Sequence, residues 1–317
     1  MAEELQCQVA TDEQKLAAFT NVHEFWGAGR TLEDHLQHRL ASRQHRRATW
    51  YVGLLNGRVV ASLGCFPMDF HVHGQLCPGI AIGAVHTHPE FRRRGFARHL
   101  IEWLEQHVRD AGAQLSLLYS DIDPAYYARL GYQRCPSHEG WADPVVDDNT
   151  DGWQLVRCDP ATAAPQLQRL YDRHHAGRTI AVARNSAYWQ YLVEKSVEDH
   201  FYWLEDLDGQ CRGFARVQVG DDLRVVDYAL TDTNQELLAQ LYRQLLRCAT
   251  PGPVGRVGGW LPDCPAAREW FQVVERPKEI TMIKLLPVAS EAEWHADKRI
   301  NQATLLAADW FLEIDHV

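Results

Sequence analysis

The chain has 317 residues, with 32 Lys and Arg against 42 Asp and Glu, and a formal net charge of -10. This acidic balance argues against a general nucleic-acid-binding protein, because affinity for phosphates comes from clustered Lys and Arg. Apolar residues make up 46% of the chain, which is enough to bury a large core. The length exceeds the usual size of one domain, so we expect two domains.

The sequence has no feature of a secreted or membrane protein. It contains no run of 18 apolar residues, and its first five residues lack the basic and apolar segments of a signal peptide. The eight cysteines form no Cys-x-x-Cys pair, which is typical of buried reduced thiols. We therefore expect a cytoplasmic protein that binds neither nucleic acid nor membrane.

The first strong element is a β-hairpin over residues 50–64. Its two apolar runs flank Asn56-Gly57, a dipeptide that strongly favours a hairpin turn.

Directly after this hairpin, four residues offer a rival interpretation: Cys65, His71, His73 and Cys77. Two Cys and two His can bind zinc tetrahedrally. Their spacing is not that of a usual zinc finger, and alternation along a strand explains the histidines. We predict no metal site and keep a structural zinc as the alternative.

An apolar strand then runs into a basic turn and a helix. The strand covers Gly79–Val85, and apolar residues recur at helical spacing from Phe96 to about Ala111. The first main-chain N–H groups of a helix have no partner within it and favour an anion. Gly95 and Ala97 let a ligand approach those groups closely. The turn therefore suits a pyrophosphate, and a solvated basic turn is the plain alternative.

The pattern Arg92-x-x-Gly95-x-Ala97 resembles the signature Arg/Gln-x-x-Gly-x-Gly/Ala of the GNAT superfamily of acyl-CoA N-acyltransferases. Downstream, a predicted strand over 115–120 leads to Tyr127-x-x-x-Gly131-Tyr132, which resembles the family's other recurrent motif. Two motifs in this order are more specific than either alone. The resemblance covers about residues 45–137.

The resemblance implies acetyl-CoA as the co-substrate. The basic turn would hold its pyrophosphate, and the pantetheine arm would pair with a strand edge that is opened by a splay between the fourth and fifth strands of the fold. Main-chain N–H near Val85 or His86 would stabilise the oxyanion. The predicted cofactor-binding residues are Val85, His86, Thr87, Arg92, Arg93, Arg94, Gly95, Phe96, Ala97, Arg98 and Ser120.

Tyr127 is the predicted general acid. A phenol with a pKa of about 10 stays protonated at neutral pH and is close enough to a thiol of about 8.5 to share its proton. Helical geometry separates Tyr127 from Tyr126 by about 100°, so we expect only one of them to face the cleft. Tyr127 has the four-residue offset to Gly131, and a plain core aromatic is its alternative role.

The second half of the chain repeats the order of the first. A hairpin around Asp208-Gly209 is followed by a strand, a helix and a strand over 223–230, 235–248 and 254–260. The turn Thr231–Glu236 has no glycine and two acids, so it should repel a phosphate. We expect a catalytic domain over 1–145, a degenerate GNAT-like domain over 146–288 and a helical tail over 289–317, with the boundary within 137–152.

This plan resembles the Eis-like branch of tandem GNAT proteins. The predicted fold class is α/β, with two tandem GNAT-like domains, each a mixed, mostly antiparallel sheet flanked by helices. Weak further matches are Glu24-Phe25-Trp26-Gly27 in the first predicted helix and Arg184 to Trp189. Only about thirty residues follow the predicted last strand of the second repeat, Ile280–Leu286, so we expect no third, sterol-carrier-like domain.

The general base has several candidates. His86 and His88 lie next to the predicted cleft, and an imidazole pKa near 6.5 suits proton transfer. Strand alternation points both histidines to one face. In Eis-like enzymes the base is linked to the C-terminal carboxylate, which the resemblance places here at Val317. A tail packed on the second domain is the alternative.

For the acceptor amine we predict a pocket of Glu24, Phe25 and Trp26, with Glu33 and Asp34 from the next helix. Aromatic faces and carboxylates suit a cationic amine, although an amphipathic helix explains the same residues. The predicted activity is acetyl-CoA-dependent N-acetylation of a small cationic amine or a lysine side chain, by direct attack. The alternatives are a non-catalytic CoA-binding scaffold and a mycothiol-synthase-like enzyme. The sheet edges leave room for a homo-oligomer.

Overall fold

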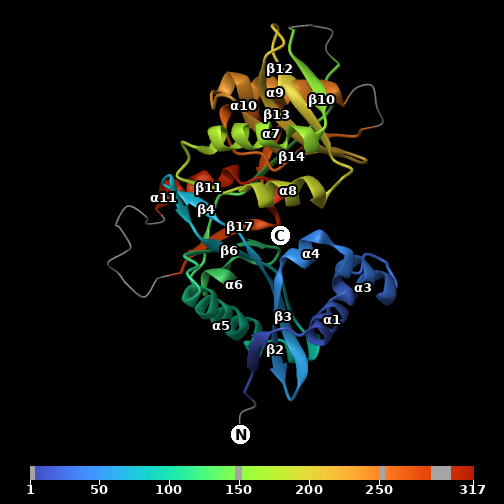
Figure 1. The fold of residues 1–317 in the computed structure, drawn as a ribbon, viewed down its shortest axis with the longest axis vertical. Coiled ribbons are helices and arrows are strands. Elements are labelled where there is room, and N and C mark those ends of the chain that lie inside the picture. Colours follow the sequence, from blue (N-terminus) through green and yellow to red (C-terminus); the bar gives the residue numbers. More distant parts are fainter. Residues whose placement is uncertain (1–3, 147–151, 250–253, 287–300) are drawn as a thin grey trace.

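The computed structural model describes residues 4–146, 152–249, 254–286 and 301–317. In this part of the chain, two seven-stranded sheets are flanked by helices, and a small three-stranded sheet lies between them (Figure 1). The elements up to residue 134 are β1 (Gln6–Val9), α1 (Asp12–Asn21), α2 (His23–Trp26), α3 (Leu32–Ala41), α4 (Arg43–Arg47), β2 (Thr49–Leu55), β3 (Arg58–Pro67), β4 (Phe70–Val72), β5 (Gln75–Cys77), β6 (Gly79–Thr87), η1 (Pro89–Phe91), α5 (Phe96–Asp110), β7 (Leu115–Ser120), α6 (Ala125–Ala128) and β8 (Gln133–Arg134).

The later elements repeat much of this order. They are β9 (His138–Ala142), β10 (Gln154–Cys158), α7 (Pro160–His175), β11 (Ile180–Val182), α8 (Ser186–Lys195), β12 (His200–Glu205), β13 (Cys211–Val219), β14 (Leu223–Leu230), α9 (Gln235–Cys248), β15 (Val257–Gly259), α10 (Pro265–Trp270), β16 (Gln272–Glu275), β17 (Ile280–Leu285), α11 (Gln302–Ala307), η3 (Ala308–Trp310) and η4 (Glu313–Asp315). The predicted strand 254–260 is thus shorter than expected.

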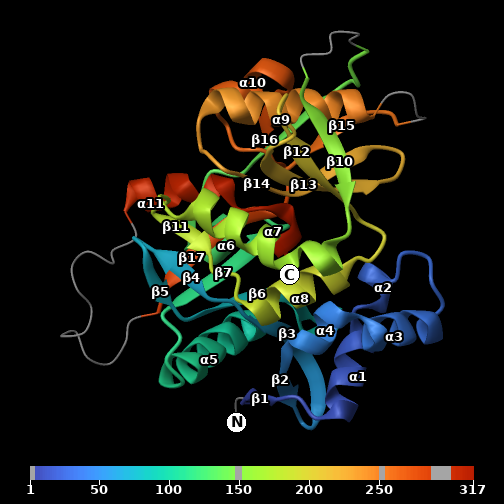
Figure 2. The same ribbon diagram turned by 45° about the horizontal axis from the view of Figure 1, so that its top comes forward.

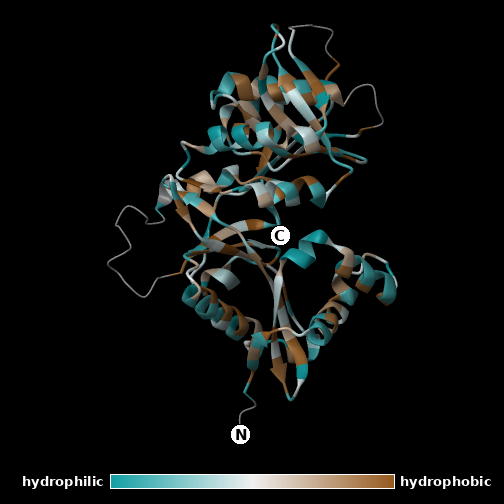
Figure 3. Cartoon of the chain, in the orientation of Figure 1, coloured by the Kyte–Doolittle hydropathy of each residue, from teal (hydrophilic) through white to brown (hydrophobic). Residues whose placement is uncertain are grey.

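The first sheet has the order β1-β2-β3-β6-β7-β17-β8. Its faces follow strand alternation: Tyr51 packs toward α5, whereas Val52 packs toward α1 on the opposite face. The helix α5 buries Leu100, Leu104 and Val108 at helical spacing. Figure 3 shows mixed polar and apolar residues along α5 and apolar residues along the strands beside it.

The second sheet has the order β10-β12-β13-β14-β15-β9-β16. In each large sheet one described pair of neighbouring strands is parallel, β6 with β7 and β14 with β15, and the other described pairs are antiparallel. The predicted fold class, with a mixed and mostly antiparallel sheet in each half, is therefore confirmed.

The two halves exchange strands, which the sequence did not predict. The strand β9 pairs with β15 and β16 of the second sheet, although it lies within the segment expected to be a domain boundary. The strand β17, predicted to end the second repeat, lies between β7 and β8 of the first sheet. Alternation along a strand predicts its buried face but not its partner strand, so this assignment was wrong. The proposed domain limits 1–145 and 146–288 stay a prediction.

Two further expectations concern metals and membranes. Cys65 and Cys77 belong to different core clusters, so the alternative zinc site does not assemble. Within the described ranges, no group of three His, Cys, Asp or Glu side chains is placed to hold a metal ion. No helix in this part of the chain has the length and apolar character needed to cross a membrane.

Candidate active site

The strands β6 and β7 part after the pair Ile82 and Leu118. On its other side β6 bulges away from β3, because His86 pairs with Ser62 while Gly83 pairs with Gly64. The two residues between them, 84 and 85, lie outside both ladders, and Ala84 has a φ of +51°. This is the splay that the family resemblance implied, and it opens the sheet at its centre.

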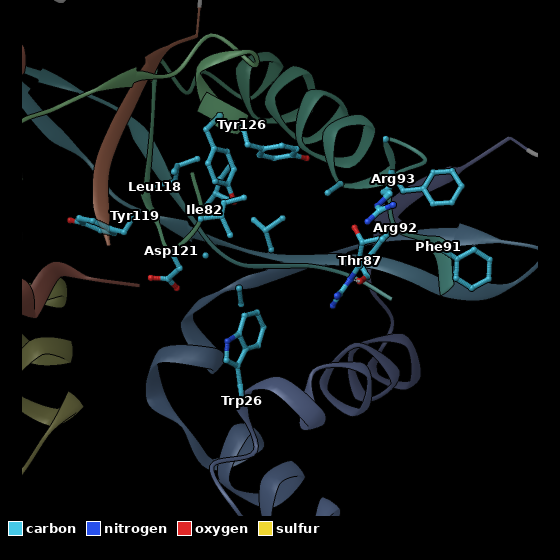
Figure 4. A pocket seen from close by; sticks show the side chains of 18 residues that line it. Trp26, Ile82, Thr87, Phe91, Arg92, Arg93, Leu118, Tyr119, Asp121 and Tyr126 are labelled. Carbon is cyan, nitrogen blue, oxygen red and sulfur yellow. Dashed lines mark hydrogen bonds between the residues drawn. The ribbon is translucent and has the colours of Figure 1, made fainter. Parts of the chain in front are cut away.

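A cleft of about 480 Å³ occupies this splay. It is bordered by the end of β6, the end of β7, the first turn of α5 and the tyrosines of α6. Figure 4 shows Arg92 and Arg93 at one end, Asp121 and Tyr119 at the other, and Trp26 on the facing wall. The cleft therefore has one basic and one acidic end.

The basic end is the N-terminus of α5. Gly95 is the N-cap residue with a φ of +79°, and no side chain caps the helix. A Cβ at Gly95 would meet open space, but the left-handed backbone there favours glycine. Gly95, Phe96 and Ala97 all line the cleft, as does Arg93. The first N–H groups of α5 are therefore free to bind an anion in the cleft.

Two of the four arginines predicted to hold a pyrophosphate line the cleft. Arg92 Nε donates to the Thr87 carbonyl oxygen at 3.2 Å, and Arg93 lies beside it. Arg94 instead packs over the ring of Phe91. Arg98 lies on the exposed face of α5, where it pairs with Glu102 at 2.8 Å. Arg94 and Arg98 are not brought into the cleft lining.

Tyr127 lies on α6 and borders the cleft, with 7% of its surface exposed. Burial raises the pKa of Tyr127, and Tyr126 and Asp121 add to this effect, so the phenol stays protonated at neutral pH, but its pKa lies further from that of a thiol than the sequence predicted. Gly131 explains the spacing of the motif: it lies two residues after Arg129, the C-cap of α6, with a φ of +91°, and Tyr132 N–H donates to the Tyr127 carbonyl oxygen at 3.2 Å. Tyr126 also borders the cleft, so the expectation that one tyrosine faces it was wrong. The short helix presents both rings edge to face at 5.0 Å.

The two histidines do not act as a pair. His86 is buried, and its ring centroid lies 5.6 Å from Phe25 and 6.3 Å from Trp26. Burial lowers the pKa of His86 to about 4, with Arg92 adding to the effect. Its side chain points toward α2 rather than into the cleft. His88 turns away, because its Nε2 lies 2.9 Å from an Arg58 nitrogen.

Of the predicted acceptor pocket, the structure brings only part together. Glu24, Phe25 and Trp26 lie on the separate short helix α2, and only Trp26 lines the cleft. Phe25 packs under the guanidinium of Arg92 at 4.8 Å, and Glu24 is exposed. Asp34 accepts a hydrogen bond from the Thr31 hydroxyl at the start of α3, and Glu33 lies beside it in that first helical turn. Neither carboxylate borders the cleft.

Ser120 is placed outside the cleft lining as well. It is buried, and its hydroxyl donates to the Ile122 carbonyl oxygen at 2.8 Å. The serine therefore shapes the turn after β7 instead of facing a ligand.

Asp121, which borders the acidic end of the cleft, was not among the residues predicted from the sequence. The antiparallel pairing of Ile280 with Ser120 places Glu279 beside it, just beyond the ends of β17 and β7. Burial raises the pKa of Glu279, and the charge of Asp121 adds to this effect. Asp121 follows a strand, where α/β sheets bind ligands, but Asp-x-Asp-Pro also indicates an ordinary turn.

The C-terminal segment contacts two residues of the cleft lining, Gly83 and Tyr119, although His316 and Val317 are not themselves part of that lining. The Val317 carbonyl oxygen lies 3.0 Å from the position that a Cβ at Gly83 would take. The ring of His316 packs against Tyr119, which lines the cleft, and against Trp260, at centroid distances of 4.9 and 5.7 Å. Both views show this end of the chain close to β6 and α8 (Figures 1 and 2). The tail therefore contacts both halves of the protein. From the sequence, a tail that reaches the first half and a tail packed on the second half were alternatives.

Comparison with known families decides the class of this site. Residues 8–135 match the acetyltransferase (GNAT) domain family. This part of the chain is a GNAT acetyltransferase domain. The enzyme class predicted from the sequence, an acyltransferase, is thereby confirmed.

Solved structures extend the likeness beyond the GNAT domain. A GCN5-related N-acetyltransferase from Anabaena variabilis is 18% identical, with a TM-score of 0.69 over 90% of this chain and 73% of that chain. One from Kribbella flavida is 19% identical, with a TM-score of 0.66 over 89% and 72%. Eis1 from Mycobacterium abscessus is 16% identical, with a TM-score of 0.57 over 89% and 74%. At these identities the likeness shows a shared fold, which confirms the tandem, Eis-like architecture. No curated protein matches the sequence significantly.

The second half differs from the GNAT domain at the helix equivalent to α5. There the Asn234 side chain caps α9 by accepting from Leu237 N–H at 2.7 Å. Asp232 in turn accepts from Asn234 N–H at 3.0 Å. A carboxylate and a side-chain cap occupy the place where an anion would bind, which supports a second half without a phosphate site.

Proposed function

We propose that the protein transfers an acetyl group from acetyl-CoA to a primary amine of a small cationic molecule or a lysine side chain. The observation that carries this proposal is the uncapped N-terminus of α5, which opens onto the splay between β6 and β7. A pyrophosphate would bind the first N–H groups of α5, flanked by Arg92 and Arg93. The pantetheine arm would then follow the free edge of β6 toward the acidic end.

The oxyanion donor in this proposal is the bulge of β6. Val85 lies outside the ladders to both neighbouring strands, whereas His86 pairs with Ser62. Main-chain N–H groups in such a bulge are already fixed, so they can stabilise the developing negative charge without reorganisation. We therefore favour Val85 over His86 for this role.

The acceptor would enter at the acidic end. Asp121 is the carboxylate bordering the cleft there, and Trp26 faces it across the gap (Figure 4). A carboxylate and an aromatic face together favour a cationic ligand. This arrangement supports a cationic amine rather than a neutral or anionic acceptor.

The reaction proceeds by direct attack. The amine nitrogen attacks the thioester carbon, the carbon–sulfur bond breaks, and the Tyr127 phenol donates its proton to the leaving thiolate. A protonated amine first releases one proton to solvent, and the neutral amine that attacks loses a second proton when the amide forms. A carboxylate at Val317 stays the predicted acceptor of that proton, and what supports it is the contact of Val317 with Gly83. His86 is the weaker candidate, because its ring packs toward α2, whereas Val317, which is also outside the cleft lining, lies against the lining residue Gly83.

Calorimetric titration with acetyl-CoA tests the cofactor site. The double variant Arg93→Glu with Gly95→Asp places two negative charges at the proposed pyrophosphate position. We expect the unaltered protein to bind and this variant to lose binding. Arg98→Glu is the matched control on the same helix, since Arg98 lies outside the cleft lining, and should retain binding. Absence of binding to the unaltered protein would contradict the proposal.

A further inference from the structure

The C-terminal segment is held by buried side chains of the second half. Asp315 of this segment accepts hydrogen bonds from Arg184 Nε at 3.2 Å and Arg184 Nη2 at 2.7 Å. The Tyr188 hydroxyl donates to the same carboxylate at 3.0 Å. The side chains of Arg184 and Asp315 are 0% and 1% exposed. Asp315 is thus fixed by a bidentate ion pair and a phenol in the interior.

Arg184 also ties the segment to the second sheet. Its Nη1 donates to both carboxylate oxygens of Asp227 on β14, at 2.8 and 3.1 Å. The guanidinium lies 3.8 Å from the centroid of the Tyr171 ring on α7. The nitrogens of the guanidinium therefore bind two carboxylates, and its plane packs on an aromatic ring. These contacts fix the orientation of Arg184, and Arg184 in turn fixes the orientation of Asp315.

Lys195, at the end of α8, fixes the main chain on either side of Asp315. Its Nζ donates to the carbonyl oxygens of Ile314 at 2.8 Å and His316 at 2.9 Å. The positive charges of Arg184 and Lys195 balance the negative charges of the two aspartates. A balanced, fully hydrogen-bonded cluster of this kind contributes a defined geometry more than net stability.

The fixed segment packs against two residues of the cleft lining. Two residues beyond Asp315, Val317 lies against Gly83, the first residue of β6 after the last pair with β7. Between them, His316 packs on Tyr119 of β7. Residues 316–317 therefore contact both strands at the point where they part.

We propose that Arg184 and Asp315 are positioning residues, through which the second half holds residues 316–317 against Gly83 and Tyr119 of the cleft lining. This inference rests on the proposed amine acetyltransferase function. It gives the half that lacks a phosphate site a role in the reaction of the other half. It also gives a role to Arg184 and Tyr188 of the stretch Arg184 to Trp189, which has no part in the proposed binding of the pyrophosphate or in proton transfer.

The test compares substitutions in the cluster with a matched buried pair elsewhere. Asp315→Asn removes the charge that faces Arg184, and Tyr188→Phe removes a single hydroxyl and is the milder change. Asp199→Asn is the control, because Asp199 pairs with the buried Arg216 at 2.6 Å and no hydrogen bond described for its side chain reaches residues 314–317, although its charge acts on Lys195. Steady-state kinetics with acetyl-CoA and a cationic amine, together with calorimetry for acetyl-CoA, provide the readout.

We expect kcat/KM for the amine to fall by about 10- to 100-fold in Asp315→Asn and in Tyr188→Phe, because small displacements at a reacting centre are costly. The Kd for acetyl-CoA should stay unchanged in both variants, and Asp199→Asn should leave both quantities unchanged. Gly83→Ala disturbs the same contact from the side of β6, because its Cβ would lie 3.0 Å from the Val317 carbonyl oxygen. This variant should also lower kcat/KM for the amine. Unchanged kinetics in the folded Asp315→Asn and Tyr188→Phe variants would overturn the inference, as would an equal loss in Asp199→Asn.

Amide hydrogen exchange separates this inference from the proposed function. Peptides covering 312–317 should exchange faster in Tyr188→Phe and in Asp315→Asn than in Asp199→Asn, whether or not an amine is acetylated. Unaltered protein that acetylates no amine would count against the proposed function alone. Unchanged exchange in this segment would count against the positioning role alone.

Discussion

Ile82 of β6 faces Leu118 of β7, and this is the last pair of the parallel ladder before the two strands diverge. The residues that follow on each strand border the cleft, with the first turn of α5 at one end and Asp121 at the other. A parallel pair that opens in this way exposes main-chain groups in the middle of a sheet, where they would otherwise be paired. The chemistry we propose depends on what binds in this opening.

Replacing Tyr127 by Phe removes the proposed proton donor and leaves the ring in place. We expect kcat to fall by about 100-fold or more, since general acids contribute at least this much in many enzymes. The Kd for acetyl-CoA should be unchanged. Tyr126→Phe is the control on the same helix and should retain activity. Equal turnover in the two variants would assign the proton to another group.

Replacing Asp121 by Asn removes the negative charge at the acceptor end with little change in shape. The KM for a cationic amine should rise by about tenfold, because a charge-assisted contact of roughly 1.4 kcal/mol is lost. Asp123→Asn is the matched control, since Asp123 Oδ1 accepts from Ala125 N–H at 2.9 Å and an amide oxygen can do the same. A KM that is unchanged in Asp121→Asn would exclude this residue from the acceptor site.

The second half should bind no acetyl-CoA. Asn234→Ala removes the cap of α9 and is expected to lower the free energy of unfolding by about 1 kcal/mol. Calorimetry should nevertheless give one acetyl-CoA per chain, with the same Kd as the unaltered protein. A second binding event, or a Kd that changes in this variant, would contradict a silent second half.

Acid should destabilise the fold through His86. Its folded-state pKa is lowered to about 4, whereas an unfolded chain has about 6.5. Above about 6.5 both states are neutral; as the pH falls from there to about 4, only the unfolded state takes up the proton, so stability decreases. His86→Gln should therefore lose less stability over this window in urea unfolding. The exposed His99→Gln is the control, and a wild-type slope in His86→Gln would show that other groups dominate.

Much of the fold followed from periodicity. The bounds predicted for α9, β7 and β14 agree with the structure, because long apolar patterns define both a helix face and a buried strand. The strand β17 was assigned to the wrong sheet, since alternation does not encode the partner strand, and β9 was not predicted because it lies in a segment expected to be a domain boundary.

The site shows the same limit. The positions of the basic turn and of Tyr127 at the cleft were predictable, because each belongs to a local motif whose residues lie within one turn. Asp121 was not predictable in this way, because its neighbour Glu279 comes from a strand far away in the sequence. The contact of Val317 with Gly83 likewise arises from packing between residues far apart in the chain. The prediction that Ser120 binds the cofactor is not supported for a local reason, since its hydroxyl donates to the Ile122 carbonyl oxygen in the turn after β7.

The most direct test of the central claim is the release of free CoA thiol when the protein is mixed with acetyl-CoA and a panel of polyamines, aminoglycosides and lysine peptides. We expect thiol release that depends on the amine and that is lost in Tyr127→Phe. Tight binding of acetyl-CoA without amine-dependent thiol release, or the same rate in Tyr127→Phe, would contradict it.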